Sequence, residues 1–498
     1  MATPQFDQPC DMSSSDRKEE KEMQLDAGKG DDRLAGEFAY TSEEDRRVLK
    51  KIDMVILPML CSVFFLQYLD KQSLSYAAVF DLITDLDLKG SQYSWCSSIF
   101  YIGQLVAEYP FIYLMSRLPL TKFVGVTVIV WGAICMCLAA PNSFAGFAAV
   151  RFLLGFAEGA VSPAFVTITS IWYQKKDHPL RIGLWVTMNG LAQVIGSLLM
   201  YGIGKNSSLG LAPWRVLFLV CGALTTFFGV LFYILMPNGP DDAWFLTKRE
   251  KEVLKLRMVA DREGGDFTRF SWMQLKEAAF DIKSWFVFAF GLLVTMQSSV
   301  LTFASLVINN IGYDKFHTVL YGSPSGAVQI VFIWIAVIGC LLLPQKRSLI
   351  VMVLTIPPLI GNVLLLKLPL STKWGLVVAS WLASIISDVM TVLLSLSASN
   401  VKGNTKRAVV NSLFFIGYCV GCIAAPQLWQ HKPKYFEGVV TAIVTWCLLF
   451  VVTGLYWYIC ASDNKKRDQE LAQGIAGDEI RPGADVTDKE DRSFRYNC

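Results

Sequence analysis

Histidine is scarce in this chain, and its three occurrences form no pattern that would bind a metal. His178, His317 and His431 stand far apart in 498 residues, and none has a partner at the spacing of zinc ligands. Charge is also scarce, since Asp, Glu, Lys and Arg make up 17% of the residues and the formal net charge is +3. So small an excess of positive charge does not indicate a nucleic-acid partner. We therefore expect no metal, no cofactor and no bound nucleic acid.

The sequence also lacks the motifs of common catalytic sites. It contains no Gly-x-x-x-x-Gly-Lys-Ser/Thr loop for the phosphates of ATP and no Gly-x-Ser-x-Gly nucleophile motif. Of the twelve cysteines, all but Cys10 and Cys498 fall inside apolar stretches. This placement is typical of free thiols that pack as small hydrophobic residues. The sequence therefore predicts that the protein is not an enzyme.

Long apolar stretches are abundant, because 53% of the residues are hydrophobic. A helix needs about 20 apolar residues to cross the ~30 Å hydrocarbon core of a bilayer, and these stretches reach that length. The sequence therefore predicts an all-α membrane protein with twelve transmembrane helices. We place them near residues 52–69, 93–114, 123–140, 144–171, 183–204, 214–236, 284–308, 326–343, 348–366, 374–398, 412–430 and 436–460.

Polar stretches between the spans divide the chain into parts. The linker in the middle contains two helix starts at capping-box spacing, Thr247 with Glu250 and Ser271 with Gln274. Both polar ends have the composition of disordered tails. The predicted parts are a tail at 1–51, a six-helix half at 52–236, the linker at 237–283, a second six-helix half at 284–460 and a tail at 461–498.

Basic residues beside the spans predict the orientation in the membrane. The short loops on the side of the linker are dense in Lys and Arg, for example Arg117, Lys122, Arg347 and Lys402. Cytoplasmic loops carry such an excess of basic residues. We therefore expect both termini in the cytoplasm, in a multi-pass and monomeric protein of the plasma membrane.

Two charged residues in the fourth span need an explanation, because a charge at mid-bilayer costs roughly 2.5–3.5 kcal/mol even on a lenient scale. Arg151 and Glu158 are seven residues apart, nearly two helical turns, so they share one face. The small residues around Glu158 would let neighbouring helices approach closely. This face must point into the bundle, where the two charges either serve a transported solute or only hold helices together.

Four further charged residues lie in or beside spans. Asp70 and Lys71 end the first span, Glu108 lies in the second, and Asp388 lies in the tenth. For Glu108 we expect a gating role or a structural pairing with loop arginines. For Asp388 we likewise expect a gating or structural role.

Uncharged polar residues within the spans are candidates for binding a solute. Asn189 and Gln193 are four residues apart and therefore neighbours on one helix face, where they could hydrogen-bond a substrate. Gln297 in the seventh span is a third candidate. Asn206 begins an Asn-Ser-Ser sequon on the side away from the linker, where it is a possible glycosylation site.

These features resemble the anion:cation symporter branch of the major facilitator superfamily, and within it the fungal allantoate permease family. The resemblance covers about residues 50–460 and departs from the family pattern at Lys71, Asn404 and Cys422, where the family often has Arg, His and Asn. It implies two six-helix halves. The motifs that carry it are YLDKQSLSYAAVF, AEYPFIYLMSRLPLTKF, RFLLGFAEGAVSPAF, PWRVLFLVCG, NGPDDAWFLTKRE and GNTKRAVVNSLFFIGYCVGCIAAPQLW.

The resemblance also implies a function and roles for the charged residues. By its motifs, Arg151 attracts an anionic substrate, and Glu158 and Asp70 carry protons. We also expect Lys71, where the chain departs from the family, to bind the substrate. The implied activity is proton-coupled symport of a small organic anion, such as allantoate, nicotinate or pantothenate. Two alternatives stay open: export of a secondary metabolite made by a biosynthetic gene cluster, and a nutrient receptor that keeps the fold without transport.

Overall fold

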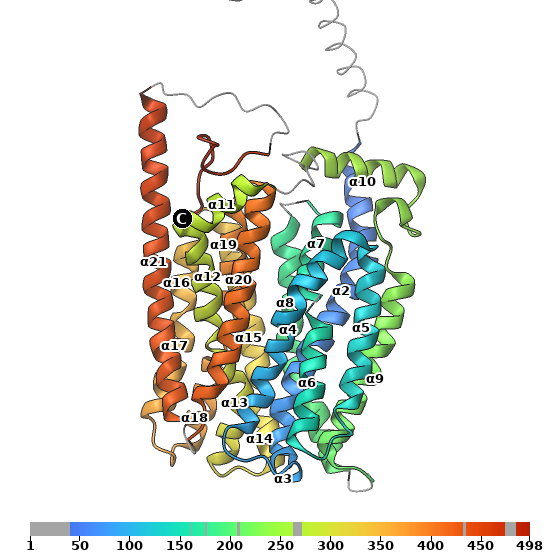
Figure 1. The fold of residues 1–498 in the computed structure, drawn as a ribbon, viewed down its shortest axis with the longest axis vertical. Helices are drawn as coiled ribbons and strands as arrows, with labels where there is room; N and C mark the ends of the chain where they lie inside the picture. Colours follow the sequence, from blue (N-terminus) through green and yellow to red (C-terminus); the bar gives the residue numbers. More distant parts are fainter. Residues whose placement is uncertain are drawn as a thin grey trace, which may run out of the picture.

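The computed structural model describes residues 40–159, 161–174, 177–206, 210–261, 271–431, 435–473 and 485–498. Over these residues the chain forms two groups of long helices that stand side by side and share one direction (Figure 1). The N-terminal half contains α2 (Ser42–Val79), α3 (Leu82–Asp85), α4 (Gln92–Arg117), α5 (Leu120–Cys137), α6 (Phe144–Glu158), α7 (Val161–Trp172), α8 (His178–Lys205) and α9 (Pro213–Leu235).

The second group follows a linker that crosses one end of the molecule (Figure 1). The linker contains the 3-10 helix η2 (Pro240–Asp242), α10 (Lys248–Asp261) and α11 (Trp272–Phe280). The C-terminal half contains α12 (Ile282–Thr295), α13 (Ser298–Asn310), α14 (Lys315–Gly322), α15 (Pro324–Leu342), α16 (Arg347–Leu354), α17 (Ile356–Lys367), α18 (Lys373–Ala383), α19 (Ser387–Ser399), α20 (Asn404–Ala424), the 3-10 helix η3 (Ala425–Leu428) and α21 (Phe436–Ala472).

The number of membrane-crossing helices agrees with the sequence. Within the described residues, eleven continuous or interrupted helices are long and apolar enough to cross a membrane. The twelfth is α4, which has 26 residues but carries Glu108 and Arg117. Each predicted span coincides with one of these twelve helices. The prediction of an all-α membrane protein with two six-helix halves is therefore confirmed.

Several spans are interrupted where the sequence weakens the helix. Pro324 begins α15, and Pro357 lies in the first turn of α17. Proline has no N–H to donate to the preceding turn, so it suits the first turn of a helix and ends the one before. The fourth span breaks after Gly159, and the tenth breaks between α18 and α19. Ser162 and Ser387, which follow the interruptions of the fourth and tenth spans, line the cavity described below.

The first helix begins earlier than the sequence analysis predicts. The expected tail ends at residue 51, whereas α2 begins at Ser42. The Thr41 hydroxyl accepts a hydrogen bond from the Glu44 N–H, and the Glu44 carboxylate accepts one from the Thr41 N–H, which is a capping box. Ion pairs from α10 hold this extra turn, with Arg257 Nη1 at 2.6 Å from Asp45. Residues 1–39 lie outside the described residues.

The end of the chain also differs from the prediction of a disordered tail after residue 460. Helix α21 continues to Ala472, and residues 485–498 pack against the C-terminal half. We call residues 485–498 the C-terminal strap. Sequence composition favoured disorder because the strap is polar. Its polar groups are instead paired with buried polar groups of the helices, which only the folded half presents.

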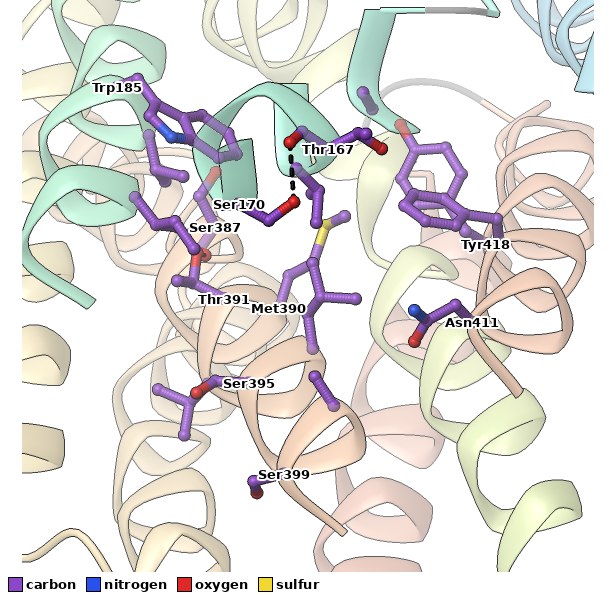
Figure 2. Close-up of a pocket in the computed structure, with 18 of the residues that line it drawn as sticks. Thr167, Ser170, Trp185, Ser387, Met390, Thr391, Ser395, Ser399, Asn411 and Tyr418 are labelled. Atoms are coloured by element: carbon purple, nitrogen blue, oxygen red, sulfur yellow. Dashed lines mark hydrogen bonds between the residues drawn. The ribbon is translucent and has the colours of Figure 1, made fainter. Parts of the chain in front are cut away.

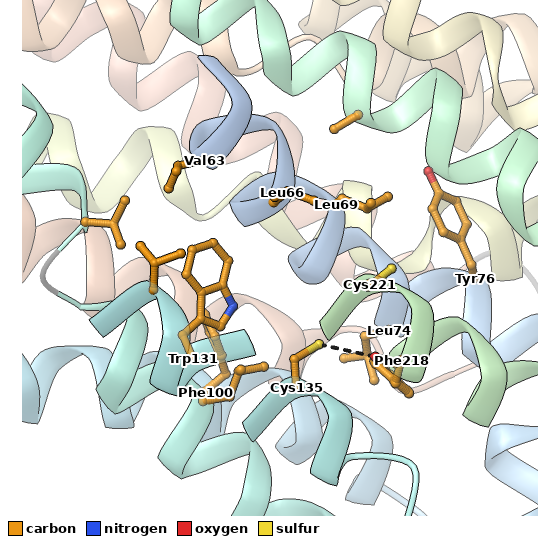
Figure 3. Close-up of a cluster of buried hydrophobic side chains, with 14 of the residues drawn as sticks. Val63, Leu66, Leu69, Leu74, Tyr76, Phe100, Trp131, Cys135, Phe218 and Cys221 are labelled. Atoms are coloured by element: carbon orange, nitrogen blue, oxygen red, sulfur yellow. Dashed lines mark hydrogen bonds between the residues drawn. The ribbon is translucent and has the colours of Figure 1, made fainter. Parts of the chain in front are cut away.

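Close packing between helices holds α6, which carries Arg151 and Glu158, in place within the N-terminal half. A Cβ added at Gly155 of α6 would lie 1.9 Å from the Phe100 carbonyl oxygen of α4, so only glycine fits there. Behind this contact, a core of Leu66, Trp131 and Cys135 joins α2 to α5, and the Cys135 thiol donates to the Phe218 carbonyl of α9 (Figure 3). The packing holds the charged face of α6 firmly against α2 and α4.

Candidate functional site

A cavity of about 1400 Å³ lies between the two halves. Its lining residues come from α2, α4, α7 and α8 on one side and from α13, α15, α19 and α20 on the other. At one end the lining includes Met258 of α10, together with Asp485 and Phe494 of the strap. Exposed residues, among them Asn404 and Ser493, belong to the lining at this end, so the cavity is open to solvent at the end of the molecule where the linker lies.

The other end of the cavity is closed by contacts between the halves. On the surface at this end, Lys315 of α14 forms an ion pair with Asp81, which follows α2. Three buried or half-buried hydrogen bonds lie deeper. They join the Ser75 and Ser305 hydroxyls (3.1 Å), the Tyr93 hydroxyl to the Thr302 carbonyl (3.2 Å), and the Ser98 hydroxyl to the Ile423 carbonyl (2.7 Å).

A column of hydroxyl groups on α19 forms one wall of the cavity (Figure 2). Ser387, Thr391, Ser395 and Ser399 are spaced four residues apart, so they lie on one face of the helix. This column was not predicted from the sequence, although four hydroxyl residues at a regular spacing of four indicate a polar helix face. The Ser387 hydroxyl accepts hydrogen bonds from the Asn189 side chain of α8 (3.3 Å) and from Gln329 of α15 (2.9 Å). Asn189 lines the cavity and contacts the opposite half, and its binding of a substrate stays a prediction.

The central charged pair joins α2 to α6. The Lys71 Nζ atom lies 2.9 Å from the Glu158 Oε1 atom. The Glu158 side chain is 0% exposed, whereas the Lys71 side chain is 17% exposed and lines the cavity. Lys71 therefore stands between the cavity and the buried carboxyl group. The sequence analysis paired Glu158 with Arg151 and did not foresee this contact.

Arg151 lies on the same face of α6 as Glu158 but behind the cavity wall. Its Nε donates to the Cys96 carbonyl of α4 at 3.2 Å, and the side chain is 3% exposed. The centroid of the Phe100 ring lies 5.5 Å from the Arg151 guanidinium and 5.9 Å from the Lys71 ammonium, so both cations contact this ring. In this conformation Lys71, and not Arg151, is the cation that lines the middle of the cavity.

Asp70 points away from its neighbour Lys71. It is 1% exposed, and its Oδ2 atom accepts a hydrogen bond from the Thr225 hydroxyl of α9 at 3.3 Å. Consecutive residues on a helix are about 100° apart, so one side chain faces the cavity and the other faces the interior of the N-terminal half. Asp70 is therefore separated from the cavity by its own helix.

The two predicted glutamines do not line the cavity. The Gln193 amide of α8 donates to the Ser325 hydroxyl of α15 at 2.8 Å, a contact between the halves. The Gln297 amide, at the break between α12 and α13, donates to the Thr445 hydroxyl of α21 at 2.5 Å. In this conformation the first joins α8 to α15 and the second joins α12 to α21.

The remaining predicted residues also lie outside the cavity wall. Glu108 on α4 is half-buried and forms no ion pair with the described residues, so the expected pairing with loop arginines is not seen there. Asp388 is 0% exposed in the first turn of α19, and neither carboxyl oxygen has a hydrogen-bond partner among the described residues. Asn206 ends α8 as an exposed residue, and the two serines of its sequon lie outside the described residues.

Comparison with known proteins gives this geometry a context. The model of the family described as Major Facilitator Superfamily matches residues 60–426. An uncharacterized transporter of Schizosaccharomyces pombe is 35% identical, over 92% of this chain and 89% of its own length. In Saccharomyces cerevisiae, the thiamine pathway transporter is 33% identical over 94% of this chain and 90% of its own, and the allantoate permease 31% identical over 93% and 88%.

Solved structures agree on the fold. A bacterial homolog of the human lysosomal transporter Spinster, crystallised in an inward-facing and occupied conformation, superposes with a TM-score of 0.60. The alignment covers 81% of this chain and 96% of that chain at 14% sequence identity. At an identity this low, the structural similarity supports the architecture of two six-helix halves and gives no information about the substrate.

Proposed function

Since this chain belongs to the Major Facilitator Superfamily, and is a multi-pass membrane transporter rather than an enzyme, we propose that it carries a small organic anion together with protons. The observation that supports this most directly is the Lys71–Glu158 pair. A cation lines the cavity, and a fully buried carboxyl group lies behind it at 2.9 Å. Arg347, Lys402 and Arg407 also line the cavity, but among the described residues Lys71 is the one of these cations that pairs with a fully buried carboxyl group.

The pair suggests how binding and protonation are coupled. An anionic substrate on Lys71 competes with Glu158 for the same ammonium group. A buried carboxylate that loses its cation is strongly disfavoured, so Glu158 then takes up a proton. Each event favours the other, which is reciprocal coupling between neighbouring sites. Arg151 adds positive charge behind Phe100, and Asp70 is a second proton carrier in the interior of the same half.

The remaining parts of the proposal concern placement and substrate class. Basic loops on the linker side support termini in the cytoplasm, so the cavity in this conformation would open to the cytoplasm. We propose a monomer in the plasma membrane of a fungal cell, because the matched relatives include fungal permeases. One relative is named for allantoate, which is a small carboxylate. Asn189 and the hydroxyl column of α19 would hydrogen-bond the neutral groups of such a substrate.

The test separates binding from coupling. Cells that express the chain are screened with radiolabelled small carboxylates, including allantoate, at pH 5 and pH 7.5. Glu158→Gln mimics the protonated carboxyl group permanently. We expect this variant to exchange the transported carboxylate across the membrane in counterflow at a rate near that of wild type. It should fail to accumulate the carboxylate against a gradient, and its dependence on pH should flatten.

A matched control is Glu108→Gln, which removes a half-buried carboxyl group outside the cavity wall. This variant should accumulate substrate as wild type does. If Glu158→Gln still concentrates the carboxylate normally, the proton is carried elsewhere and Asp70 becomes the better candidate. Failure of every carboxylate in the screen would contradict the proposed substrate class.

A further inference from the structure

The C-terminal strap, residues 485–498, lies on the C-terminal half beside the open end of the cavity. Although it contains no helix or strand, several of its side chains are almost completely buried. Thr487, Asp488, Asp491 and Tyr496 are 0%, 1%, 3% and 4% exposed. Burial of so many polar side chains in one short segment requires matched partners for each of them. The strap therefore occupies a specific docking site.

The centre of this docking site is a buried lysine. Lys406, in the first turn of α20, is 1% exposed, and its Nζ lies within 2.8 Å of three carboxylates. Glu277 comes from α11, Asp281 precedes α12, and Asp488 comes from the strap. The Tyr496 hydroxyl donates to the second oxygen of Asp488 at 2.7 Å. The strap thus completes the charge compensation of an ammonium group that has left water.

Two asparagine side chains fix the register of the strap backbone. The Asn400 amide, after α19, donates to the Asn497 carbonyl (2.9 Å) and accepts from the Asn497 N–H (2.7 Å). The Asn464 amide of α21 makes the same pair of bonds to Tyr496, at 2.8 and 2.9 Å. Each side-chain amide pairs with both the backbone N–H and the backbone carbonyl of one strap residue, as the backbone of a neighbouring β-strand would. Such pairing allows one alignment of the strap and no sliding.

All of these partners belong to the C-terminal half or to α11. A segment tied in this way moves with the C-terminal half when the two halves rearrange. Five strap residues line the cavity: the half-buried Val486 and Phe494 are apolar, and Asp485, Asp491 and Ser493 are polar. On the opposite side of the same cavity, the lining includes Ile182 of α8 in the N-terminal half and Met258 of the linker helix α10. Apolar surface therefore faces the open end from both sides of the cavity.

We propose that the strap is the C-terminal half's part of the gate at the linker end of the cavity. When the halves close at this end, Val486 and Phe494 meet the apolar residues on the opposite side of the cavity, and the apolar area leaves water. The contact stabilises the state that is closed at the linker end. Loss of these two side chains shifts the molecule toward the open state described here, because that state lacks the contact.

The test measures how often the linker end is open. Ala398 is an exposed residue of α19 that lines the cavity, so Ala398→Cys reports access to it. In full-length chains that carry this reporter, modification by N-ethylmaleimide is followed at the peptide level by mass spectrometry. This readout separates the reporter from the twelve native cysteines. We expect Val486→Ala and Phe494→Ala each to raise the modification rate of the reporter at least two-fold.

The control is Arg495→Ala in the same segment. Arg495 pairs with Asp468 of α21 at 2.9 Å, away from the cavity, and its loss should leave the rate unchanged. Should Phe494→Ala fail to reach the membrane, Val486→Ala decides the question alone. An unchanged modification rate in the alanine variants overturns the proposal. A lower rate also overturns it, because it would show that the strap stabilises the open state of the linker end. The readout needs no substrate and no proton gradient, so it stands apart from the proposed anion symport.

Discussion

At the scale of single residues, the chemistry depends on which cation reaches the cavity. The resemblance to known symporters assigns substrate attraction to Arg151. In this conformation Arg151 is covered by Phe100 and bound to the Cys96 carbonyl, whereas Lys71 is partly exposed to the cavity. Substitution of Lys for the family's usual Arg loses the planar fork that binds a carboxylate at two points, but keeps the charge. We therefore propose that Lys71, rather than Arg151, contacts the anion in this conformation.

The residue-scale prediction concerns Lys71. We expect Lys71→Ala to reduce uptake of the transported carboxylate more than ~10-fold, which corresponds to about 1.4 kcal/mol of lost interaction. Lys71→Arg should retain more uptake, because it restores the charge. Initial uptake rates, corrected for surface expression, measure the effect. Lys205→Ala, at the exposed end of α8, is the control. Near-normal uptake by Lys71→Ala would exclude Lys71 as an anion contact.

At the scale of helices, the linker end of the C-terminal half is organised by charges at helix ends. Burial alone would raise the pKa of Asp281, but the hydrogen bond and the charge of Lys406 outweigh it and hold the pKa below its usual range. The same carboxylate also caps α12 by accepting from the Lys283 N–H. One aspartate thus connects α12 to α20, and Lys406 extends the connection to α11 and to the strap.

The helix-scale prediction follows from the lowered pKa of Asp281. A carboxyl group whose pKa is lower in the folded state stabilises it at pH above the unfolded pKa of about 3.9, and loses this effect as pH falls through the folded pKa. We therefore expect Asp281→Asn to be less stable than wild type at pH 7, by roughly 1–3 kcal/mol. The difference should shrink below about pH 4.

Thermal unfolding of the purified protein in detergent measures this difference across the pH range. Lys489→Met is a graded comparison, because Lys489 is half exposed and pairs with Asp281 at 3.6 Å, a longer distance than that of the buried Lys406. It should change the midpoint little. A difference between Asp281→Asn and wild type that stays constant from pH 7 to the acid range would show that the Asp281 charge does not stabilise the fold.

At the scale of the whole molecule, the cavity is open at one end and closed at the other. The linker end is open, while hydrogen bonds and the Asp81–Lys315 ion pair join the halves at the other end. The Asp81 and Lys315 side chains are 51% and 44% exposed, so the pair contributes only about 0–1 kcal/mol. Even so small a contribution counts where two states of similar free energy compete.

The whole-molecule prediction reverses one of these charges. Lys315→Glu places two carboxylates together and should weaken closure at this end, which favours closure at the linker end. We expect the modification rate of the Ala398→Cys reporter to fall about two-fold at low salt, and less at high salt. Adding Asp81→Asn removes the repulsion but not the loss of the ion pair, so it should return the rate only part of the way. Asparagine suits this position because it tolerates the positive φ of 71° found there. An unaffected rate in Lys315→Glu would show that the ion pair has no part in the balance.

Local sequence patterns were enough to predict the number of transmembrane helices and which charged residues are hidden from lipid. Apolar length sets where a helix crosses the bilayer, and the seven-residue spacing sets Arg151 and Glu158 on one face. Both follow from helix geometry and from the absence of water in the bilayer, which are local rules. The capping box at Thr41 and Glu44 was readable in the same way, although the predicted tail extended over it.

The partners of these residues depend on the tertiary structure and could not be predicted from local patterns. Glu158 meets Lys71 of another helix, Arg151 lies under Phe100, and Asn189 meets Ser387 across the two halves. These contacts depend on how each helix is rotated about its axis and on where it crosses its neighbours. The strap was mistaken for a disordered tail for the same reason, because its order comes from partners such as Lys406 that the chain brings together only after folding. A local pattern fixes which face is buried, whereas packing between distant segments fixes what that face touches.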